Sequence, residues 1–167
     1  MSINNNLKET QGFFFEMMLA GYTSKEEPEK FFQFDGHKGT KRFSYQKAGG
    51  WHGIDEWEHT SGEWSKGTTL IYKDGRPVWQ MDYWGYYPKE CIPFLKKALA
   101  KNYRERLWLG GRGPNIFELP NESWFYSNST FVEHDFHEFL GRDFIVDKVT
   151  RKEVGWHRYT GSSFLKT

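Results

Sequence analysis

The chain has 167 residues, and its 23 basic against 22 acidic residues leave a net charge of +1. A near-neutral chain has no overall field to draw it to nucleic acid or a membrane, so neither partner is expected. One cysteine, Cys91, excludes an internal disulfide framework. The length, the single cysteine and the lack of a long apolar run predict one cytoplasmic domain over 1–167, as a monomer or homodimer.

The first half of the chain predicts one helix followed by strands. Residues 10–22 have helical character, with Thr10 as the N-cap and Gly21 near the end. Residues 23–40 are polar and glycine-containing, which is typical of a loop. Strands are predicted at 42–47 and 51–59, separated by a pair of glycines.

Asp74-Gly75 is the clearest local signal, because it lies between two β-rich runs and favours a two-residue hairpin turn. The register of such a hairpin places Leu70 and Tyr72 on one face. This face, expected to be the core, also carries Trp79, Met81 and Tyr83. The opposite, wetter face is expected to carry Val78, Gln80, Asp82 and Trp84.

A second helix is predicted over 92–104, where Ile92, Leu95, Leu99 and Tyr103 recur at helical spacing. Residues 107–120 are then expected to form a loop that includes a glycine-rich stretch at 110–114. From Ser123 onward, apolar and polar residues alternate, which predicts three or four more strands.

Several residue pairs recur at an offset of 74–76, among them Glu58-His59 with Glu133-His134 and Tyr83 with Tyr159. We therefore predict an α+β fold of two imperfect repeats, about 10–87 and 88–167. Each repeat contributes a helix and antiparallel strands, with the helices packed on the sheet. A groove between the repeats is the expected ligand site.

Two stretches resemble a bacterial family described as a domain of unknown function. They are Asp74–Gly85 (DGRPVWQMDYWG) and Phe139–Ile145 (FLGRDFI), together with the step Leu107–Gly111. Some members of that family carry a Xre-type helix-turn-helix ahead of this domain. The resemblance implies the same fold and an effector-binding role, and it brings no catalytic residues.

Four histidines are candidate site residues. His59 and His134 occupy equivalent repeat positions, and if the fold brings them together they could bind an anion or a metal, or exchange protons near pH 7. His137 follows His134 at a spacing that puts the two rings on opposite faces of a strand, so no metal site is predicted. His157 aligns with Met81 and is expected to be either a buried core histidine or part of an inner pocket.

The remaining candidates are one arginine and four aromatic residues. Arg112, within the glycine-rich loop, could meet a phosphate or carboxylate, although the loop is better explained as a plain turn after a helix. The aromatic residues, 19% of the chain, exceed what its core needs. Four of them are expected to stack on a ligand or partner, namely Trp51, Trp57, Trp84 and Tyr86.

These residues favour a non-enzymatic binding module that holds a small ligand or a protein partner in the groove between the repeats. No nucleophile motif is present, and no cofactor is implied. Two alternatives stay open. One is a small hydrolase or isomerase that uses a histidine with a carboxylate, and the other is an interaction or inhibitor protein from a mobile element.

Overall fold

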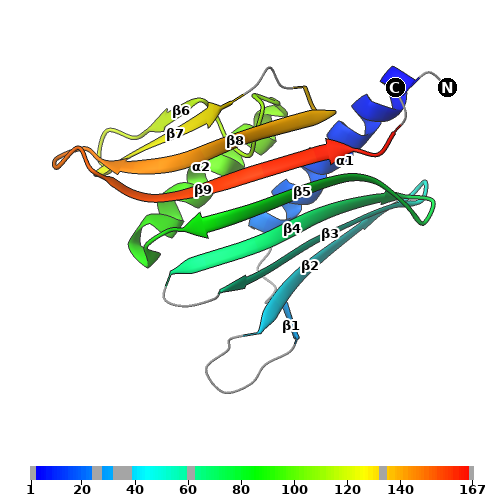
Figure 1. Cartoon of the computed structure of the whole chain (residues 1–167), viewed down its shortest axis with the longest axis horizontal. Coiled ribbons are helices and arrows are strands. Elements are labelled where there is room, and N and C mark those ends of the chain that lie inside the picture. Colours follow the sequence, from blue (N-terminus) through cyan, green and yellow to red (C-terminus); the bar gives the residue numbers. More distant parts are fainter. Residues whose placement is uncertain (1–2, 24–27, 32–38, 60–62, 132–134, 166–167) are drawn as a thin grey trace.

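In the computed structural model, which describes residues 3–23, 28–31, 39–59, 63–131 and 135–165, the strands form one antiparallel sheet. Nine strands of the described residues lie in the order β1-β2-β3-β4-β5-β9-β8-β7-β6 (Figure 1). Chain neighbours pair with one another throughout, except where β5 meets β9. The fold is therefore mixed α and β, with most of the structure in the sheet.

The strands fall into two runs along the chain. The first comprises β1 (Glu29–Phe31), β2 (Thr40–Lys47), β3 (Trp51–His59), β4 (Trp64–Lys73) and β5 (Arg76–Tyr86). The second comprises β6 (Ile116–Glu118), β7 (Trp124–Thr130), β8 (Glu138–Asp147) and β9 (Glu153–Ser163). Each run is a meander, because strands that are consecutive in the chain pair antiparallel with one another.

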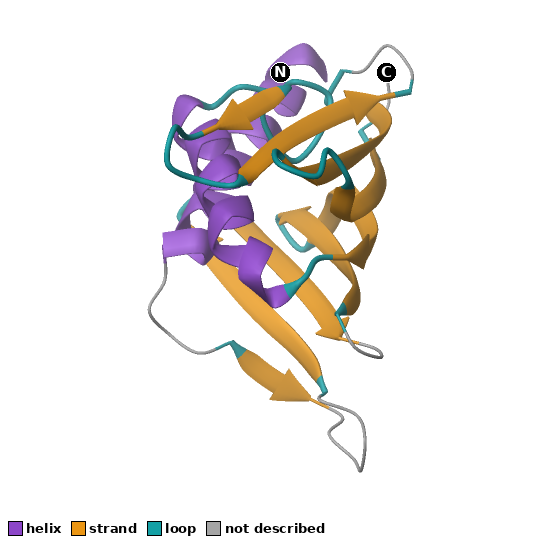
Figure 2. Ribbon diagram, turned by 90° about the vertical axis from the view of Figure 1, so that its left-hand side faces the viewer, coloured by secondary structure: helices purple, strands orange, loops and turns teal. Residues whose placement is uncertain are grey.

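Both helices lie on the same side of the sheet, while its other side carries no helix among the described residues (Figure 2). Helix α1 spans Ile3–Thr23, and α2 spans Ile92–Glu105 after a single turn η1 (Lys89–Cys91). Proline in the first turn of α2 costs no hydrogen bond, and α2 ends where Arg106 takes up the left-handed conformation. We call the helix-covered side the inner face and the other side the open face.

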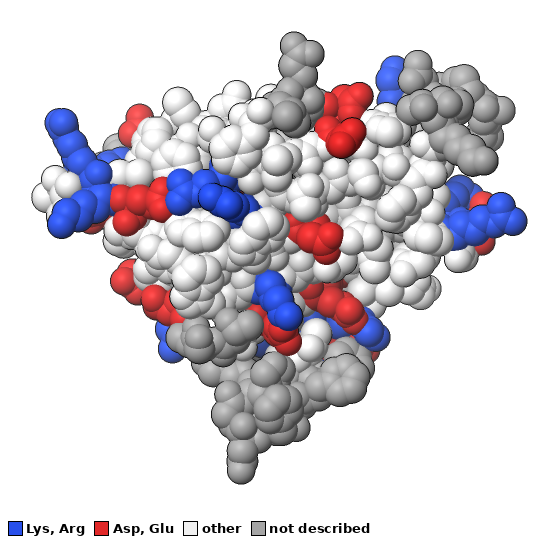
Figure 3. Space-filling view, viewed as in Figure 1, with Lys and Arg blue, Asp and Glu red and all other residues white. Residues whose placement is uncertain are grey.

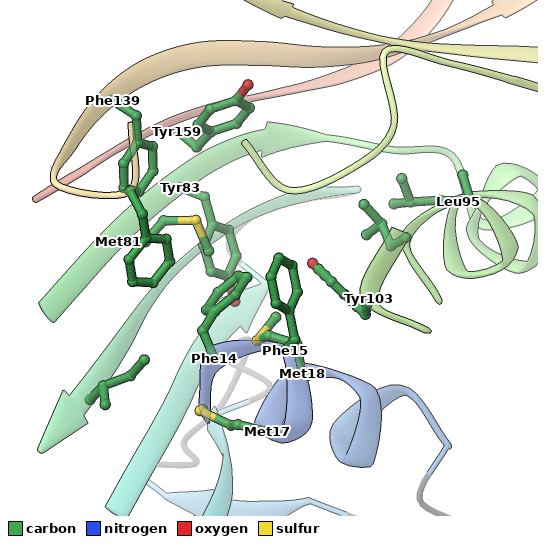
Figure 4. Packing of buried hydrophobic residues seen from close by; sticks show 14 of the residues in the cluster. Phe14, Phe15, Met17, Met18, Met81, Tyr83, Leu95, Tyr103, Phe139 and Tyr159 are labelled. Atoms are coloured by element: carbon green, nitrogen blue, oxygen red, sulfur yellow. The ribbon is translucent and has the colours of Figure 1, made fainter. Parts of the chain in front are cut away.

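The core lies between the helices and the inner face. Figure 4 shows Phe14 and Phe15 reaching from α1 toward Met81 and Tyr83 of β5. Trp79 of β5 is fully buried and stacks on Phe136 with ring centroids 4.7 Å apart. Aromatic residues thus supply much of the apolar area removed from water on folding.

The Asp74-Gly75 hairpin is confirmed, but the predicted facing of β4 is wrong. Both turn residues have positive φ, as a two-residue hairpin turn requires. The register then shifts between Ile71 and Tyr72, so that Ile71 pairs with Trp79. A β-bulge of one residue reverses the facing of every later residue in the pair. Ile71 and Thr69 are therefore buried in place of Leu70 and Tyr72.

Other differences concern element boundaries. Helix α1 begins seven residues before the predicted start at Thr10, whose hydroxyl donates to the Asn6 carbonyl within the helix. The predicted loops at 23–40 and 107–120 contain the short edge strands β1 and β6. Val78, expected on the wetter face, is buried beside the bulge. Neither helix among the described residues combines the length and apolarity of a membrane span.

Candidate functional site

The pairing of β5 with β9 joins the two meanders, and we call this junction the seam. Tyr83 pairs with Tyr159 at its middle, and Gly85 pairs with His157. Because side chains alternate between faces along a strand, each strand of the seam contributes to both faces. The inner face of the seam carries a buried polar network, and the open face carries exposed aromatic and basic residues.

We call the network on the inner face the polar cluster. Its centre is Asp143 of β8, which is fully buried. Tyr87 donates a hydrogen bond to Asp143 Oδ1 at 2.9 Å, and Tyr126 donates one to Oδ2 at 3.3 Å. Arg112 Nε lies 4.0 Å from Oδ2 and completes an ion pair. A buried carboxylate is tolerated only when such partners offset its lost hydration.

His157 connects Arg112 to the first meander. The Nη1 atom of Arg112 donates to His157 Nδ1 at 2.5 Å, and His157 Nε2 lies 3.0 Å from Ser65 Oγ on β4. The Arg112 guanidinium also lies over the Tyr83 ring, 4.6 Å from its centroid. The polar cluster therefore ties the 107–114 loop to strands from both meanders.

The arginine fixes the tautomer of His157. A guanidinium has only donors, so Nδ1 must accept, and the neutral ring carries its proton on Nε2. Burial, aided by Arg112, lowers the pKa of His157 well below its usual value. The Nε2–H group then donates to Ser65 Oγ and cannot accept that hydroxyl's proton. Ser65 and His157 consequently do not form a nucleophile with its base.

A second carboxylate lies farther along the inner face. Asp55 of β3 accepts hydrogen bonds on Oδ1 from Thr69 at 2.8 Å and from Tyr83 at 3.1 Å. Burial raises the pKa values of both Asp55 and Asp143, while Arg112 acts in the opposite direction on each. The polar cluster thus holds its charges in place by mutual contacts among buried groups.

Glycine is required where the strands of the seam approach one another. Gly85 has φ +151°, and a Cβ atom there would lie 2.1 Å from the Trp156 carbonyl oxygen and 2.8 Å from His157 Cα. No larger residue fits without moving the backbone. Gly85 therefore lets β9 lie close enough to bring His157 under the 107–114 loop.

The open face of the seam carries two parallel rows of side chains that cross the strands. One row follows the pairs Ser129–Arg142, Arg142–Arg158, Arg158–Trp84 and Trp84–Lys66. The adjacent row is aromatic from β8 to β4 and consists of Phe144, Trp156, Tyr86 and Trp64. Figure 3 shows this face, where uncharged side chains predominate and charged groups gather over the β8–β9 hairpin.

A hollow of about 400 Å³ opens on this face, and we call it the open-face hollow. Its lining comes from β7, β8, β9 and the residue that follows β7, and consists of Ser129, Phe131, Arg142, Phe144, Trp156 and Arg158. The Arg142 guanidinium lies 5.1 Å from the Trp156 ring and 5.5 Å from the Phe144 ring. Arg158 lies 5.9 Å from the Trp156 ring. A flat ring bordered by two cations is suited to ligands that combine a ring with an anionic group.

The predicted site residues lie in three places, which are the polar cluster, the open face and the edge of the core. Arg112 and His157 meet in the polar cluster, whereas Trp84 and Tyr86 lie on the open face beside the hollow. Trp84 is 40% exposed. Trp51 and Trp57 are half-buried and pack against the core, with Trp51 stacked on Phe13 of α1 at 5.2 Å.

The remaining histidines are not brought together by anything the structure describes. His59 is half-buried at the end of β3, on the side of the polar cluster, and it contributes to lowering the His157 pKa. His137 lies just before β8, where its backbone N–H donates to Asp135. His134 lies outside the described residues, so the proposed convergence of His59 with His134 stays a prediction. Within the described residues, no group of three potential ligands is placed to hold a metal ion.

The sequence alone did not point to the main residues of the polar cluster or of the open-face hollow. Arg142 and Asp143 stand out in the sequence only as part of a structural motif, and no motif singles out Arg158 or Trp156. A usable signal exists for the open face, because Arg142 and Phe144 are two apart on β8, as are Trp156 and Arg158 on β9. Residues two apart share a face of a strand. The pairing of β8 with β9 that joins these pairs is decided by the tertiary fold.

A family model for a domain of unknown function, DUF5680, matches residues 58–163. This range is more than half of the chain, and it includes β4, β5, α2, the 107–114 loop and β6 to β9, with both faces of the seam. No curated protein and no solved structure matches the chain. The chain therefore belongs to the DUF5680 family.

Proposed function

We propose that this chain is a non-enzymatic binding module whose ligand lies on the open face, in the open-face hollow beside the seam. The ligand is a small molecule, or an exposed group of a partner, that carries a flat ring and a negative charge. The observation that carries this proposal is the hollow itself, where two arginines border Trp156. Its volume is about 400 Å³, and because it is half open to solvent it would hold a ligand against the sheet without enclosing it.

The exposure of aromatic residues around the hollow supports this assignment. Trp84, Trp64 and Phe131 are 40%, 45% and 56% exposed, although their rings have large apolar areas. Exposed aromatic residues next to one another commonly mark an interaction site. The aromatic residues of the inner face, by contrast, are buried in the core and are not accessible to a ligand.

The pairing register across the seam supports the further proposal that the chain arose by duplication. At an offset of 76, Tyr83 corresponds to Tyr159, Met81 to His157 and Gly85 to Gly161. Tyr83 pairs with Tyr159, and the pairs Met81–Gly161 and Gly85–His157 are the ones that a twofold axis at that point would exchange. The seam is then the junction between two related halves, and the open-face hollow lies beside it on the second half rather than in a groove between the two.

The cellular setting is part of the same proposal. We infer a cytoplasmic bacterial protein that senses an effector, in line with the resemblance to proteins that carry a Xre-type helix-turn-helix. The alternative of acid-base catalysis is favoured by one observation, the meeting of Arg112, His157 and Asp143. It ranks second because the fixed tautomer of His157 leaves that ring without a free acceptor nitrogen.

The test uses the tryptophan indole N–H signals in NMR spectra of the ¹⁵N-labelled protein, assigned by single substitutions. Indole-3-acetate and phenyl phosphate are the probes, because each joins a ring to an anion. We expect the signals of Trp156, Trp84 and Trp64 to shift on titration. The core signals of Trp79 and Trp108 serve as the internal control and should not move. Shifts confined to the core signals, or none at all, would contradict the proposal.

A further inference from the structure

Arg142 and Arg158 face each other directly across the β8–β9 ladder. Like charges in that position repel and destabilise a sheet, and the ion pair between Arg142 and Glu153 offsets part of that repulsion. A bound anion between the two guanidinium groups would offset the rest. Two facing guanidinium groups match a doubly charged phosphate better than a singly charged carboxylate, and arginine also meets phosphate oxygens in pairs.

The neighbouring carboxylates leave one of these arginines available. Glu153 accepts from Arg142 Nη2 at 2.5 Å, and Glu58 pairs with Lys66 in the same row at 2.7 Å. Arg158 forms no ion pair with any of the residues that the structure describes, and it is exposed. The local positive charge is therefore centred on Arg158, with Arg142 held beside it.

The rings of the hollow provide a stacking surface next to this charge. Phe131 is 56% exposed at one side, while Trp156 and Phe144 form the floor. Trp156 and Arg158 are two residues apart on β9 and therefore share a face, and the Arg158 guanidinium lies 5.9 Å from the Trp156 ring, so both are within reach of one small ligand. A planar base stacks on such rings regardless of its substituents.

We propose that the open-face hollow binds a nucleotide unit, with its phosphate on Arg158 and Arg142 and its base against Phe131 and Trp156. This inference rests on the proposed function, since it names the ligand class of the same site. The near-neutral charge of the whole chain does not oppose it, because the relevant field is local. The unit is either a free mononucleotide or one residue of a single strand, whose next base would reach Trp84 across the seam.

The experiment is isothermal titration calorimetry of the full chain with AMP, UMP, adenosine, inorganic phosphate and an eight-residue single-stranded oligonucleotide. We expect AMP to bind with a Kd below about 1 mM, and adenosine and phosphate each to bind at least about tenfold more weakly. Arg158→Gln should weaken AMP binding about tenfold, and Phe131→Ser about fivefold. Arg104→Gln, which removes an exposed charge from α2, is the matched control and should leave the Kd unchanged.

Titration with the oligonucleotide distinguishes the two candidate ligands, a free mononucleotide and one residue of a single strand. Tighter binding than AMP, with log K falling against log salt at a slope of about −0.7 per phosphate contacted, assigns the site to a single strand. Equal or weaker binding assigns it to a free nucleotide. The inference is overturned if neither AMP, UMP nor the oligonucleotide binds, or if Arg158→Gln binds AMP as the wild type does. If indole-3-acetate and phenyl phosphate still shift the Trp156 signal in that case, the binding module stands and only its ligand class is wrong.

Discussion

The two faces of the seam use the same strands for opposite purposes. On the inner face, Asp143, Arg112 and His157 are buried and engage one another. On the open face, Trp84 and Arg158 are exposed and engage little besides their neighbours in the sheet. Polar groups that are removed from water must form hydrogen bonds or ion pairs within the protein, and they are then not available to bind a ligand. Groups left in water keep that capacity, which is why we assign binding to the open face.

The largest effect is expected when the polar cluster loses its carboxylate. Asp143→Ala leaves Arg112 buried without its ion-pair partner and deprives the Tyr87 and Tyr126 hydroxyl groups of their acceptor. Removing one member of a buried pair costs about 3–5 kcal/mol. Urea unfolding followed by circular dichroism measures the free energy of unfolding. A loss below about 1 kcal/mol would show that the polar cluster does not hold the fold together.

The close approach at the seam is tested by Gly85→Ala. The added Cβ atom would meet the Trp156 carbonyl oxygen, and the backbone would keep an unfavourable φ. We expect a loss of about 2–4 kcal/mol from overpacking and backbone strain together. Gly75→Ala is the matched control, because Gly75 also has a positive φ but a Cβ atom there would meet nothing within 4 Å. This substitution should lower the free energy of unfolding by only about 1 kcal/mol. Equal losses in the two variants would rule out a special requirement for glycine at the seam.

The pH dependence of stability should depend on His157. Its pKa is lowered in the folded protein, so the unfolded chain binds a proton that the folded one does not. Stability from this group is present above pH 6.5 and is lost as the pH falls below that value, with a slope of up to about 1.4 kcal/mol per pH unit. The raised pKa values of Asp55 and Asp143 act in the opposite sense above pH 3.8.

His157→Gln isolates that contribution. The difference in unfolding free energy between the wild type and this variant, measured from about pH 7.5 to about pH 5.5, should shrink as the pH falls. Each aspartate contributes about equally to both proteins and therefore cancels in the difference. A difference for His157→Gln that stays constant over this pH range would contradict a lowered pKa of that ring.

The smallest effect on stability is expected on the open face. Trp84→Ala removes a ring that is 40% exposed, so the loss should be about 0.5–1 kcal/mol. The same variant should weaken binding of indole-3-acetate or of the oligonucleotide at least about fivefold if the ligand extends across the seam. Thermal unfolding and the NMR titration measure the two quantities. A loss of stability equal to that of Asp143→Ala would contradict the view that the inner face stabilises the fold and the open face does not.

Local signals in the sequence located several parts of the fold. Asp74-Gly75 specified the hairpin, since both of its residues adopt positive φ readily, and the spacing of Leu95, Leu99 and Tyr103 specified α2. Trp84 was correctly predicted to lie away from the core face, because side chains alternate along β5 and Met81 and Tyr83 face the core. The facing of β4 was missed because the bulge near Tyr72 leaves no mark in the alternation of the strand itself.

Turns and helices depend on contacts between residues close in the chain, so both helices and the longer strands could be predicted from the sequence alone, whereas the short edge strands β1 and β6 could not. The position of β5 beside β9 could not, although it places Arg112 against His157 on one face and Trp84 against Arg158 on the other. That pairing joins residues up to 84 positions apart, Trp79 with Ser163, through backbone hydrogen bonds that any two strands can form. The choice among such pairings is made by the packing of both meanders against the helices, and no local pattern records it.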